Sequence, residues 1–466
     1  MLGRFTFLSR AQVETLHRNA LRVLTEIGVR VEHEELVKRL RSVGGTVNSA
    51  GHVQFTSCQI ERNVFEGSTQ AAELDPMQVF VGVYQSWYLD PETGRCEPFT
   101  EDRLARYIGL AARLPLISHT HVLGLPFVPN DLPVEFLPLA EKLYAWKHGA
   151  RPGGSVQHTS LAEPLIQMFH CHAEMSGQPL EKIFRAEGYL ITPLKLARPE
   201  CEQFLFFADR GLRMRLGHLP SQGGTAPVTF AGAITLALAE QLFLHLVNRA
   251  IWPDTQLSLS GEVMTMDPRT GVSRYGRPEQ QRINAAFADL ARFYQCGCTG
   301  HTGLSDALAP SVEAGAQKAM GALMTALATG TGTIEAGLLA TDEICSPLQM
   351  VLDHDLAGAL SALLKEPVVS DADCLVEEIR RIGSTRHFLD SELTASRCRE
   401  EFFLPRTWST QSLSSWRNGV PKIDIDLARD LVRQFTKEFS STTGITQEEE
   451  RELRKIMRAA IRCGTQ

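Results

Sequence analysis

Eight short apolar runs recur along the chain at near-constant spacing, and this repetition constrains the fold more than any other feature of the sequence. Each run has the length of a buried β-strand, and successive runs lie roughly 30–40 residues apart. The predicted strands cover residues 79–84, 116–123, 151–157, 183–188, 214–218, 256–261, 295–301 and 331–337.

Helical patterns fill the intervals between these runs. Thr100 is placed to cap a helix that ends near Leu114, and Pro278 opens a helix whose apolar residues keep i, i+3, i+4, i+7 spacing. Eight strand–helix alternations predict an α/β fold of the (β/α)8 TIM-barrel type. A doubly wound open sheet is the alternative. It would favour a glycine-rich phosphate loop after an early strand, and the sequence has no GxGxxG or GxxxxGK[ST] there.

Segments before and after the repeat predict two additions to the barrel. Residues 1–78 contain two helical patterns, 11–27 and 34–43, followed by the strand-like HVQFT, and form a small N-terminal cap. Residues 79–365 form the barrel, and residues 366–466 form a helical C-terminal extension. The amphipathic stretches at 424–435 and 445–462 are typical of a packed or an oligomeric surface, so a homo-oligomer is expected.

Charge and composition narrow the class of partners and the compartment. The formal net charge is -7 and no Lys/Arg block occurs, which argues against nucleic acid and anionic membranes as partners. The apolar stretch 226–247 carries Glu240, Gln241 and His245, and is typical of a buried helix rather than a membrane span. Ten cysteines without framework spacing indicate reduced thiols and a cytoplasmic location, and no signal peptide is recognisable.

The active site of a (β/α)8 barrel lies at the carboxyl ends of its strands, and the residues there are aromatic, His and acidic. Tyr84, Trp87 and Tyr88 follow the first strand, and aromatic faces attract a quaternary ammonium by roughly 0.5–2 kcal/mol per ring. Packing of these rings between barrel and cap is the alternative. The further candidates at the strand ends are Gln85, His119, His121, Gln157, His158, Glu187, His218, Ser260, Glu262, Ser305, Asp306 and Thr333.

Two strand-end residues are predicted to act in catalysis, Glu335 and His301. A carboxylate in a barrel mouth is costly unless it is paired or serves a cation. The alternative for Glu335, and for Glu187, is a buried pair with a barrel arginine such as Arg151 or Arg185.

Cys296, Cys298 and His301 form a C-x-C-x-x-H pattern at the end of the seventh strand, which could hold zinc. No third or fourth ligand is evident nearby, and alternation on a buried strand explains the two cysteines. We therefore predict no metal site.

Several segments, in order along nearly the whole chain, resemble one protein family. They are PVTFAGAITLALAE (227–240), GEVMTMDPRTGVSRYGRPEQQRINAAFADLARFY (261–294), HTGLSDALAPSVEAG (301–315), GTIEAGLLATDEICSPLQMVLDHDLAG (332–358) and RHFLDSELTASRCREEFFLPRTW (386–408). The opening LRVLTEIGVRVEHEELVKRLRSVGGTVN is also similar. The family is that of trimethylamine methyltransferase and its glycine betaine methyltransferase relatives. Every position here is an ordinary amino acid, so the chain resembles the branch without pyrrolysine.

This resemblance implies a TIM barrel that transfers a methyl group from a quaternary amine, glycine betaine or a related betaine, to cob(I)alamin on a cognate corrinoid protein. The family's TDAK is SDAL here, at residues 305–308, and its glycine-rich stretch after the first strand is VGVYQSW, so the substrate can differ from glycine betaine. If the substrate is a betaine, its carboxylate needs donors, and His301, Gln85 or Gln157 could supply them. Two alternatives stay open: a zinc-dependent thiol or alcohol corrinoid methyltransferase, and a non-catalytic betaine-binding barrel.

Overall fold

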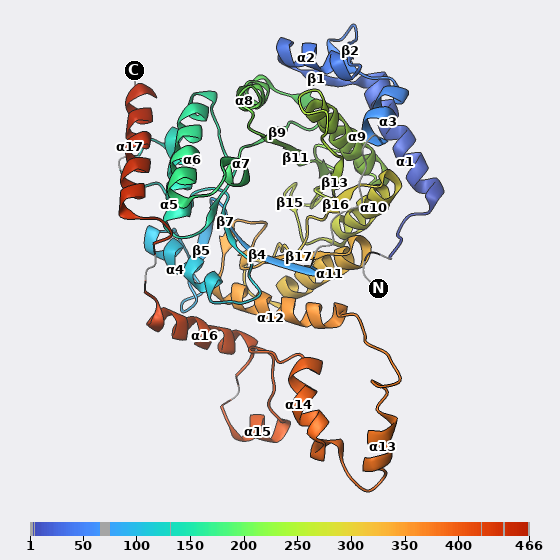
Figure 1. Cartoon of the computed structure of the whole chain (residues 1–466), viewed down its shortest axis with the longest axis vertical. Helices are drawn as coiled ribbons and strands as arrows, with labels where there is room; N and C mark the ends of the chain where they lie inside the picture. The colour runs from blue at the N-terminus through green and yellow to red at the C-terminus, as the bar shows by residue number, and fades with distance from the viewer. Residues whose placement is uncertain are drawn as a thin grey trace.

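A computed structural model describes residue 3 and residues 5–65, 75–130, 132–420, 422–440 and 443–464. Eight parallel strands lie at the places that the apolar runs predict, and they alternate with helices (Figure 1). The strands are β4 (Met77–Val83), β7 (Thr120–Val122), β8 (Arg151–Pro152), β9 (Glu187–Leu190), β11 (Arg215–His218), β13 (Ser258–Ser260), β16 (Gly297–Thr299) and β17 (Gly332–Glu335).

These strands form three separate parallel ladders rather than one continuous sheet. The orders are β17-β4-β7-β8, β11-β9 and β13-β16. Single bonds connect neighbouring ladders: the Glu187 amide donates to the Gly154 carbonyl (2.8 Å), and the Thr302 hydroxyl donates to the Thr333 carbonyl (3.1 Å). The expected α/β alternation is confirmed, but no ladder among the described residues closes the strands into a complete barrel.

Two predicted strands begin four residues too early: β7 starts at Thr120 rather than at residue 116, and β9 starts at Glu187 rather than at residue 183. The structure shows the reason for β9. Residues 183–188 were expected to be extended, whereas the helical turn α7 (Leu180–Ile183) occupies the first position and β9 begins only at Glu187. Pro179 precedes this turn, and the Phe184 amide closes it by donating to the Leu180 carbonyl at 2.8 Å. The turn therefore delays the strand by four residues.

Helices cover the outer face of the strands. They are α4 (Glu101–Ala112), α5 (Leu137–Lys147), α6 (Ala162–Ser176), α8 (Arg198–Ala208), α9 (Phe230–Arg249), α10 (Pro278–Tyr294), α11 (Val312–Thr329) and α12 (Pro347–Leu364). Val79, Val81 and Val83 of β4 are buried, whereas Phe80 and Tyr84 on the alternate face are half-buried. This alternation packs one face of the strand against helices and turns the other toward the interior.

Helix α9 is long and apolar enough to cross a membrane by length and composition, and it is the one such helix among the described residues. In the structure, 78% of the most apolar 18-residue stretch of this helix is buried inside the fold. Its buried Glu240 accepts hydrogen bonds from the Leu194 amide and the Thr192 hydroxyl, each at 2.9 Å. The helix is therefore a core element of this fold, as its polar residues predicted.

The N-terminal segment adds α1 (Arg10–Arg22), α2 (Glu34–Leu40) and α3 (Ser57–Phe65), together with a sheet in the order β10-β1-β3-β2. The strands are β1 (Val29–Val31), β2 (Thr46–Val47), β3 (His52–Gln54) and β10 (Lys195–Leu196). Because β10 belongs to the segment after β9, this sheet joins the N-terminal segment to the body of the fold.

Further short strands lie at the ends of the main ladders. They form the sheets β18-β19-β5-β6 and β12-β14-β15, from β5 (Trp87–Leu89), β6 (Cys96–Glu97), β18 (Leu338–Leu339), β19 (Ile344–Cys345), β12 (Ser221–Gln222), β14 (Met264–Met266) and β15 (Ser273–Arg274).

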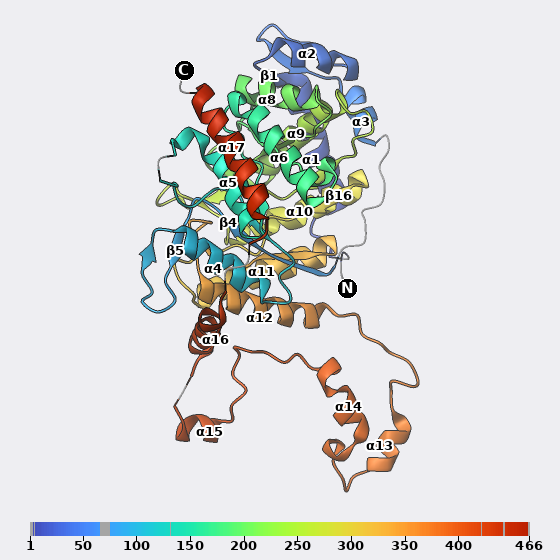
Figure 2. The same cartoon turned by 60° about the vertical axis from the view of Figure 1, so that its left-hand side comes forward.

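The C-terminal segment consists of α13 (Val376–Ile382), α14 (Glu392–Glu401), α15 (Leu413–Asn418), α16 (Asp424–Glu438) and α17 (Gln447–Gly464). Helices α16 and α17 return to the body, where α16 packs on α12 and α17 on α5 and α6. Of the two possibilities for these amphipathic stretches, the structure therefore selects packing within the chain. Helices α13, α14 and α15 instead project away from the body in both views (Figures 1 and 2).

Candidate functional site

A cavity of about 410 Å³ lies at the carboxyl ends of β4, β7 and β8. Its lining combines residues that follow these strands with two loops from the second half of the chain. The lining residues are Tyr84, Gln85, Leu123, Gly124, Leu125, Leu137, Pro138, Glu141, Ser155, Gln157, Tyr275, Thr341, Asp342 and Glu343. No lysine or arginine is among them, so the charge presented by this lining is acidic.

Glu335 ends β17 beside this cavity, and its side chain is buried. The Tyr84 hydroxyl donates to its Oε1 at 3.2 Å. A methyl group on Gly82 would lie 1.9 Å from the same oxygen, so the carboxylate occupies space that only glycine leaves free. Burial raises the pKa of Glu335 to about 7, and the Tyr84 hydrogen bond and the charge of Lys318 oppose that rise.

The predicted alternative, a pair between Glu335 and a barrel arginine, is absent from the described residues. The buried Lys318 donates to the backbone carbonyl of Glu335 (2.8 Å) and pairs with Asp353 (2.7 Å) instead of with the Glu335 carboxylate. The Glu335 carboxylate therefore lacks a permanent counter-ion, and a cationic ligand would supply one.

Asp342 brings a second carboxylate to the cavity. Its Oδ1 is buried and has no hydrogen-bond partner among the described residues. Burial and the neighbouring Glu335 charge raise the pKa of Asp342 well above its usual range. Ala340, Thr341 and Asp342 all have positive φ, at 54°, 58° and 71°. Left-handed backbone is unfavourable for such residues and concentrates at functional sites.

Tyr275, from the second half of the chain, contributes a second aromatic ring to the cavity that Tyr84 also lines. Its ring meets the His301 ring edge to face at 4.5 Å and 84°. Burial and the charges of Asp342 and Glu335 raise the pKa of Tyr275, so the phenol stays protonated. His301 Nδ1 lies 3.0 Å from the Gln280 side-chain amide, and burial lowers the pKa of the imidazole, which keeps it neutral.

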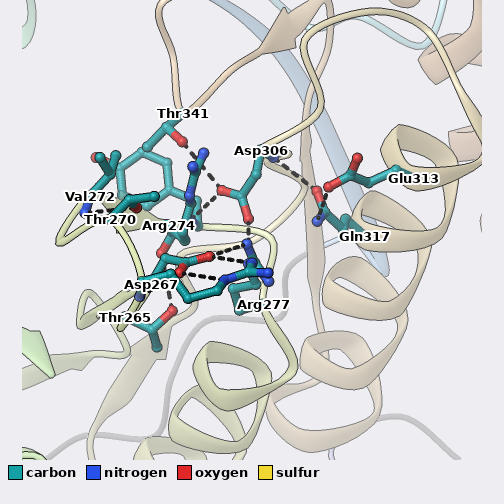
Figure 3. A network of polar contacts seen from close by, with 12 residues as sticks. Thr265, Asp267, Thr270, Val272, Arg274, Arg277, Asp306, Glu313, Gln317 and Thr341 are labelled. Carbon is teal, nitrogen blue, oxygen red and sulfur yellow. Dashed lines mark hydrogen bonds and ion pairs between the residues drawn. The ribbon is translucent and has the colours of Figure 1, made fainter. Parts of the chain in front are cut away.

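Ser305 and Asp306 do not line the cavity but hold the loops that do. Figure 3 shows Asp306 between Thr341 and Gln317. Asp306 Oδ1 accepts from the Tyr275 amide (2.8 Å) and the Thr341 hydroxyl (3.2 Å). Both the Ser305 hydroxyl and the Asp306 amide donate to Oε1 of Gln317, each at 2.8 Å. These two predicted ligands thus tie the Tyr275 and Asp342 segments together.

Arg277 extends this network toward solvent. It lies 3.3 Å from Asp306 and 3.1 Å from Asp267, and Asp267 also pairs with Arg269 at 2.9 Å (Figure 3). The negative charge of Asp306 is therefore neutralised within the protein and is not presented to the cavity.

Of the remaining predicted binding residues, two line the cavity and one, Thr333, does not. Gln85 and Gln157 line the cavity, and Gln157 has a positive φ of 61°. Thr333 lies two residues before Glu335 on β17, and its carbonyl accepts from Thr302. Gln85 and Gln157 are therefore available as neutral donors for a polar ligand group.

Of the three aromatic residues predicted to form a cage, the structure brings only Tyr84 to the cavity. Trp87 is 52% exposed, lies on β5 and is not in the cavity lining. Tyr88 points the other way, with its ring against Phe99 (5.5 Å) and under the Arg103 guanidinium (5.2 Å). Alternation along β5 turns Trp87 and Tyr88 to opposite faces, so the structure does not bring the three rings together, and Tyr88 packs as the alternative interpretation expected.

The strand-end histidines have structural partners. His119 and His121 contact each other, and burial lowers the pKa of each to about 4. His158 accepts from the Ser160 amide at 3.2 Å, and His218 is 2.7 Å from the buried Glu240.

Glu187 and Glu262 both face Arg215, at 3.8 Å and 3.2 Å. Glu187 is therefore paired with a barrel arginine, as the structural alternative predicted, although the partner is Arg215 rather than Arg151 or Arg185. Ser260 holds its strand end to α9, since its amide donates to Gln241 at 2.7 Å.

Cys296 and Cys298 lie on and next to β16, and burial raises the pKa of each thiol to about 12. His301 uses Nδ1 toward Gln280. Among the described residues, no group of three His, Cys, Asp or Glu side chains is placed to hold a metal ion.

The sequence-based prediction missed Tyr275 and Asp342. Both lie in loops beyond the strand ends, where strand counting assigns no position. A signal for Tyr275 existed in the YGRPE segment that resembles the family, and one for Asp342 in the TDE that follows GTIEAGLLA.

An α/β fold with an acidic, aromatic cavity at the carboxyl ends of its strands is typical of an enzyme that acts on a small molecule. The sequence profile of the trimethylamine methyltransferase family (MTTB) matches residues 1–459. The chain belongs to this family of methyltransferases, which confirms the resemblance.

Individual relatives agree with this assignment. Glycine betaine methyltransferase of Desulfitobacterium hafniense is 24% identical over 435 residues, covering 89% of each chain. Trimethylamine methyltransferase MttB of Methanosarcina barkeri is 29% identical over 198 residues, which is 42% of this chain and 40% of that protein. The crystal structure of the Methanosarcina barkeri monomethylamine methyltransferase shares the fold at a TM-score of 0.52 and 11% identity, covering 94% of this chain and 90% of that one.

Proposed function

We propose that this protein transfers a methyl group from a small quaternary amine to the cob(I)alamin of a separate corrinoid protein. Family membership supports the reaction class. The observation that carries the choice of a cationic substrate is the cavity, which Asp342 and the rings of Tyr84 and Tyr275 line without any lysine or arginine. Glu335 lies beside it and accepts a hydrogen bond from the Tyr84 hydroxyl.

Recognition of the ammonium group is the first task of these residues. A trimethylammonium head has no N–H to donate, so it is held by ring faces and by negative charge rather than by directed hydrogen bonds. Tyr84 and Tyr275 supply the faces, while Glu335 and Asp342 supply the charge. Gln85 and Gln157 are placed to donate to a polar arm, such as the carboxylate of glycine betaine or a related betaine.

The methyl transfer itself requires few further protein groups. The bond between nitrogen and one methyl carbon breaks, its electron pair stays on nitrogen, and a neutral tertiary amine leaves. A cob(I)alamin presented at the cavity would supply the electron pair for the new bond to the methyl carbon. Because no proton is transferred, the cavity needs no general acid, and its residues act by orienting the substrate and excluding water.

The same proposal extends to the architecture and setting. We take the three parallel ladders as sections of one (β/α)8 barrel, since their strands follow one another in barrel order. We also propose a cytoplasmic location, because all ten cysteines are free thiols.

The decisive experiment is a screen of glycine betaine, other betaines, choline and tetramethylammonium for methylation of cob(I)alamin, followed by absorbance. One quaternary amine should give turnover, and trimethylamine should give none. Binding without turnover, even with added corrinoid protein, would indicate a binding barrel. Activity with thiols or methanol together with stoichiometric zinc would support the zinc-dependent alternative.

A further inference from the structure

The segment from Lys365 to Val420, here called the arm, leaves the body after α12 and projects from its outer side (Figures 1 and 2). It contains α13, α14 and α15. The arm returns at Arg406 and Thr407, whose amides donate to Asp355 of α12 at 2.7 and 2.6 Å. Phe403 also packs beside Gly358 of that helix.

The arm has almost no core of its own. Ile382 is its only buried large apolar side chain. Twelve of the thirty exposed large apolar side chains among the described residues lie in its 56 residues, out of 466 in the chain. They are Val368, Val369, Val376, Ile379, Phe388, Leu389, Phe402, Leu404, Trp408, Leu413, Trp416 and Val420. Such a density is typical of a surface that is covered in the assembled protein.

The arm also forms a groove of about 890 Å³ between the end of α12, α13 and α14. Val368, Leu375, Phe388, Leu389 and Phe402 are among its lining residues. The exposed apolar side chains of the arm amount to on the order of 1,000–1,500 Å², more than the roughly 800 Å² per partner of a standard interface.

We propose that the arm is the surface through which a second copy of this chain binds. Interfaces this apolar are typical of permanent partners rather than of proteins that exchange between sites. A corrinoid protein must approach the substrate cavity and then leave it. No residue of the arm lines that cavity, and α13, α14 and α15 project from the body beyond α12 (Figure 1).

The charges of the arm agree with self-association. The arm contains nine acidic and eight basic residues, although the whole chain has a net charge of -7. In a two-fold symmetric interface the same patch faces itself, so a nearly neutral, mixed patch avoids repulsion between the copies.

The test compares the molar mass of wild type with that of a variant carrying Leu389→Asp and Phe402→Asp, by light scattering on a sizing column. Wild type should elute at twice 51.6 kDa or a higher multiple, and the variant at 51.6 kDa. Val312→Asp is the matched control, since Val312 is 91% exposed but lies on α11 outside the arm, and it should leave the mass unchanged. Near-UV circular dichroism checks that each variant is folded.

A second measurement does not depend on variants. Wild-type chains with and without ¹⁵N label are mixed under dissociating dilution, concentrated and cross-linked, and links between labelled and unlabelled arms should appear. Wild type at 51.6 kDa at every concentration would overturn the proposal, as would the absence of mixed-label arm links. So would protection of the arm from hydrogen exchange that appears only when a corrinoid protein is added.

Discussion

Replacing Glu335 by glutamine should weaken substrate binding without loosening the fold. At roughly 5 Å and an effective dielectric constant of about 20, a carboxylate and an ammonium interact by about 3 kcal/mol. Asp342 remains in the variant and water competes, so we expect a loss of about 1.4–2.7 kcal/mol, or roughly tenfold to a hundredfold in Kd. The glutamine carbonyl can still accept from Tyr84, and Lys318 keeps its partner Asp353.

The assay is calorimetric titration with the active quaternary amine, alongside thermal unfolding of the same preparation. Asp353→Asn is the contrasting variant, because it leaves the buried Lys318 unpaired and should cost about 3–5 kcal/mol of stability. If Glu335→Gln lowers the melting temperature but leaves Kd unchanged, the carboxylate is a structural group and the reasoning is wrong.

Three further outcomes follow from the same cavity. A methyl group added at Gly82 would lie 1.9 Å from the Glu335 carboxylate oxygen, so Gly82→Ala should displace the carboxylate. The rate of methyl transfer should then fall at least about tenfold. Unchanged initial rates would count against this contact. Tyr275→Ala should weaken binding by about 0.5–2 kcal/mol, whereas Trp87→Ala should not, and equal Kd values in a titration would contradict the assignment of the rings. The pKa of Glu335 in the folded protein is raised to about 7, so folding stability should fall as pH rises from the ordinary carboxyl range through 7. Substrate affinity should rise over the same interval, because the carboxylate becomes charged. Melting temperatures with and without substrate at several pH values check both trends.

The positions of strands and helices were accessible from the sequence because they depend on local pattern. Apolar runs, Thr100 as a cap and the proline at the start of α10 each act within one turn or strand. Glu335 could also be placed, because a residue that ends a strand inherits its position from that strand. Closure of the strands into one barrel could not be predicted to the level of hydrogen bonds, since strands of two or three residues leave few ladder bonds to count.

The three aromatic residues of the predicted cage do not come together in the structure, for a different reason. Tyr84, Trp87 and Tyr88 are close in sequence, but a strand turns alternate side chains to opposite faces, and Trp87 and Tyr88 belong to β5, which pairs with β19 rather than continuing β4. The ring that does join Tyr84 comes from Tyr275, almost two hundred residues later. Only the tertiary fold, through the bond from the Tyr275 amide to Asp306, brings that residue into place.

The loop that carries Asp342 has an unfavourable backbone conformation, and the surrounding structure holds it in place. Three consecutive left-handed residues cost on the order of 1 kcal/mol each or more, and a buried, unpaired carboxylate adds to that cost. Backbone bonds hold the loop from one side: the Ala340 amide donates to the Ala307 carbonyl (2.9 Å) and the Thr341 amide to the Ser305 carbonyl (3.0 Å).

The opposite side of the loop is held through Glu343, whose carbonyl accepts from the Trp87 amide at 2.8 Å. Asp306 fixes the Thr341 hydroxyl as well. We therefore propose that Ser305, Asp306 and the backbone of Trp87 act as positioning residues, which aim the Asp342 carboxylate instead of touching the substrate. A loop held from both sides in a strained conformation has little freedom to relax when the cavity is empty, so the Asp342 carboxyl group is in place before the cation arrives and binding does not have to order it.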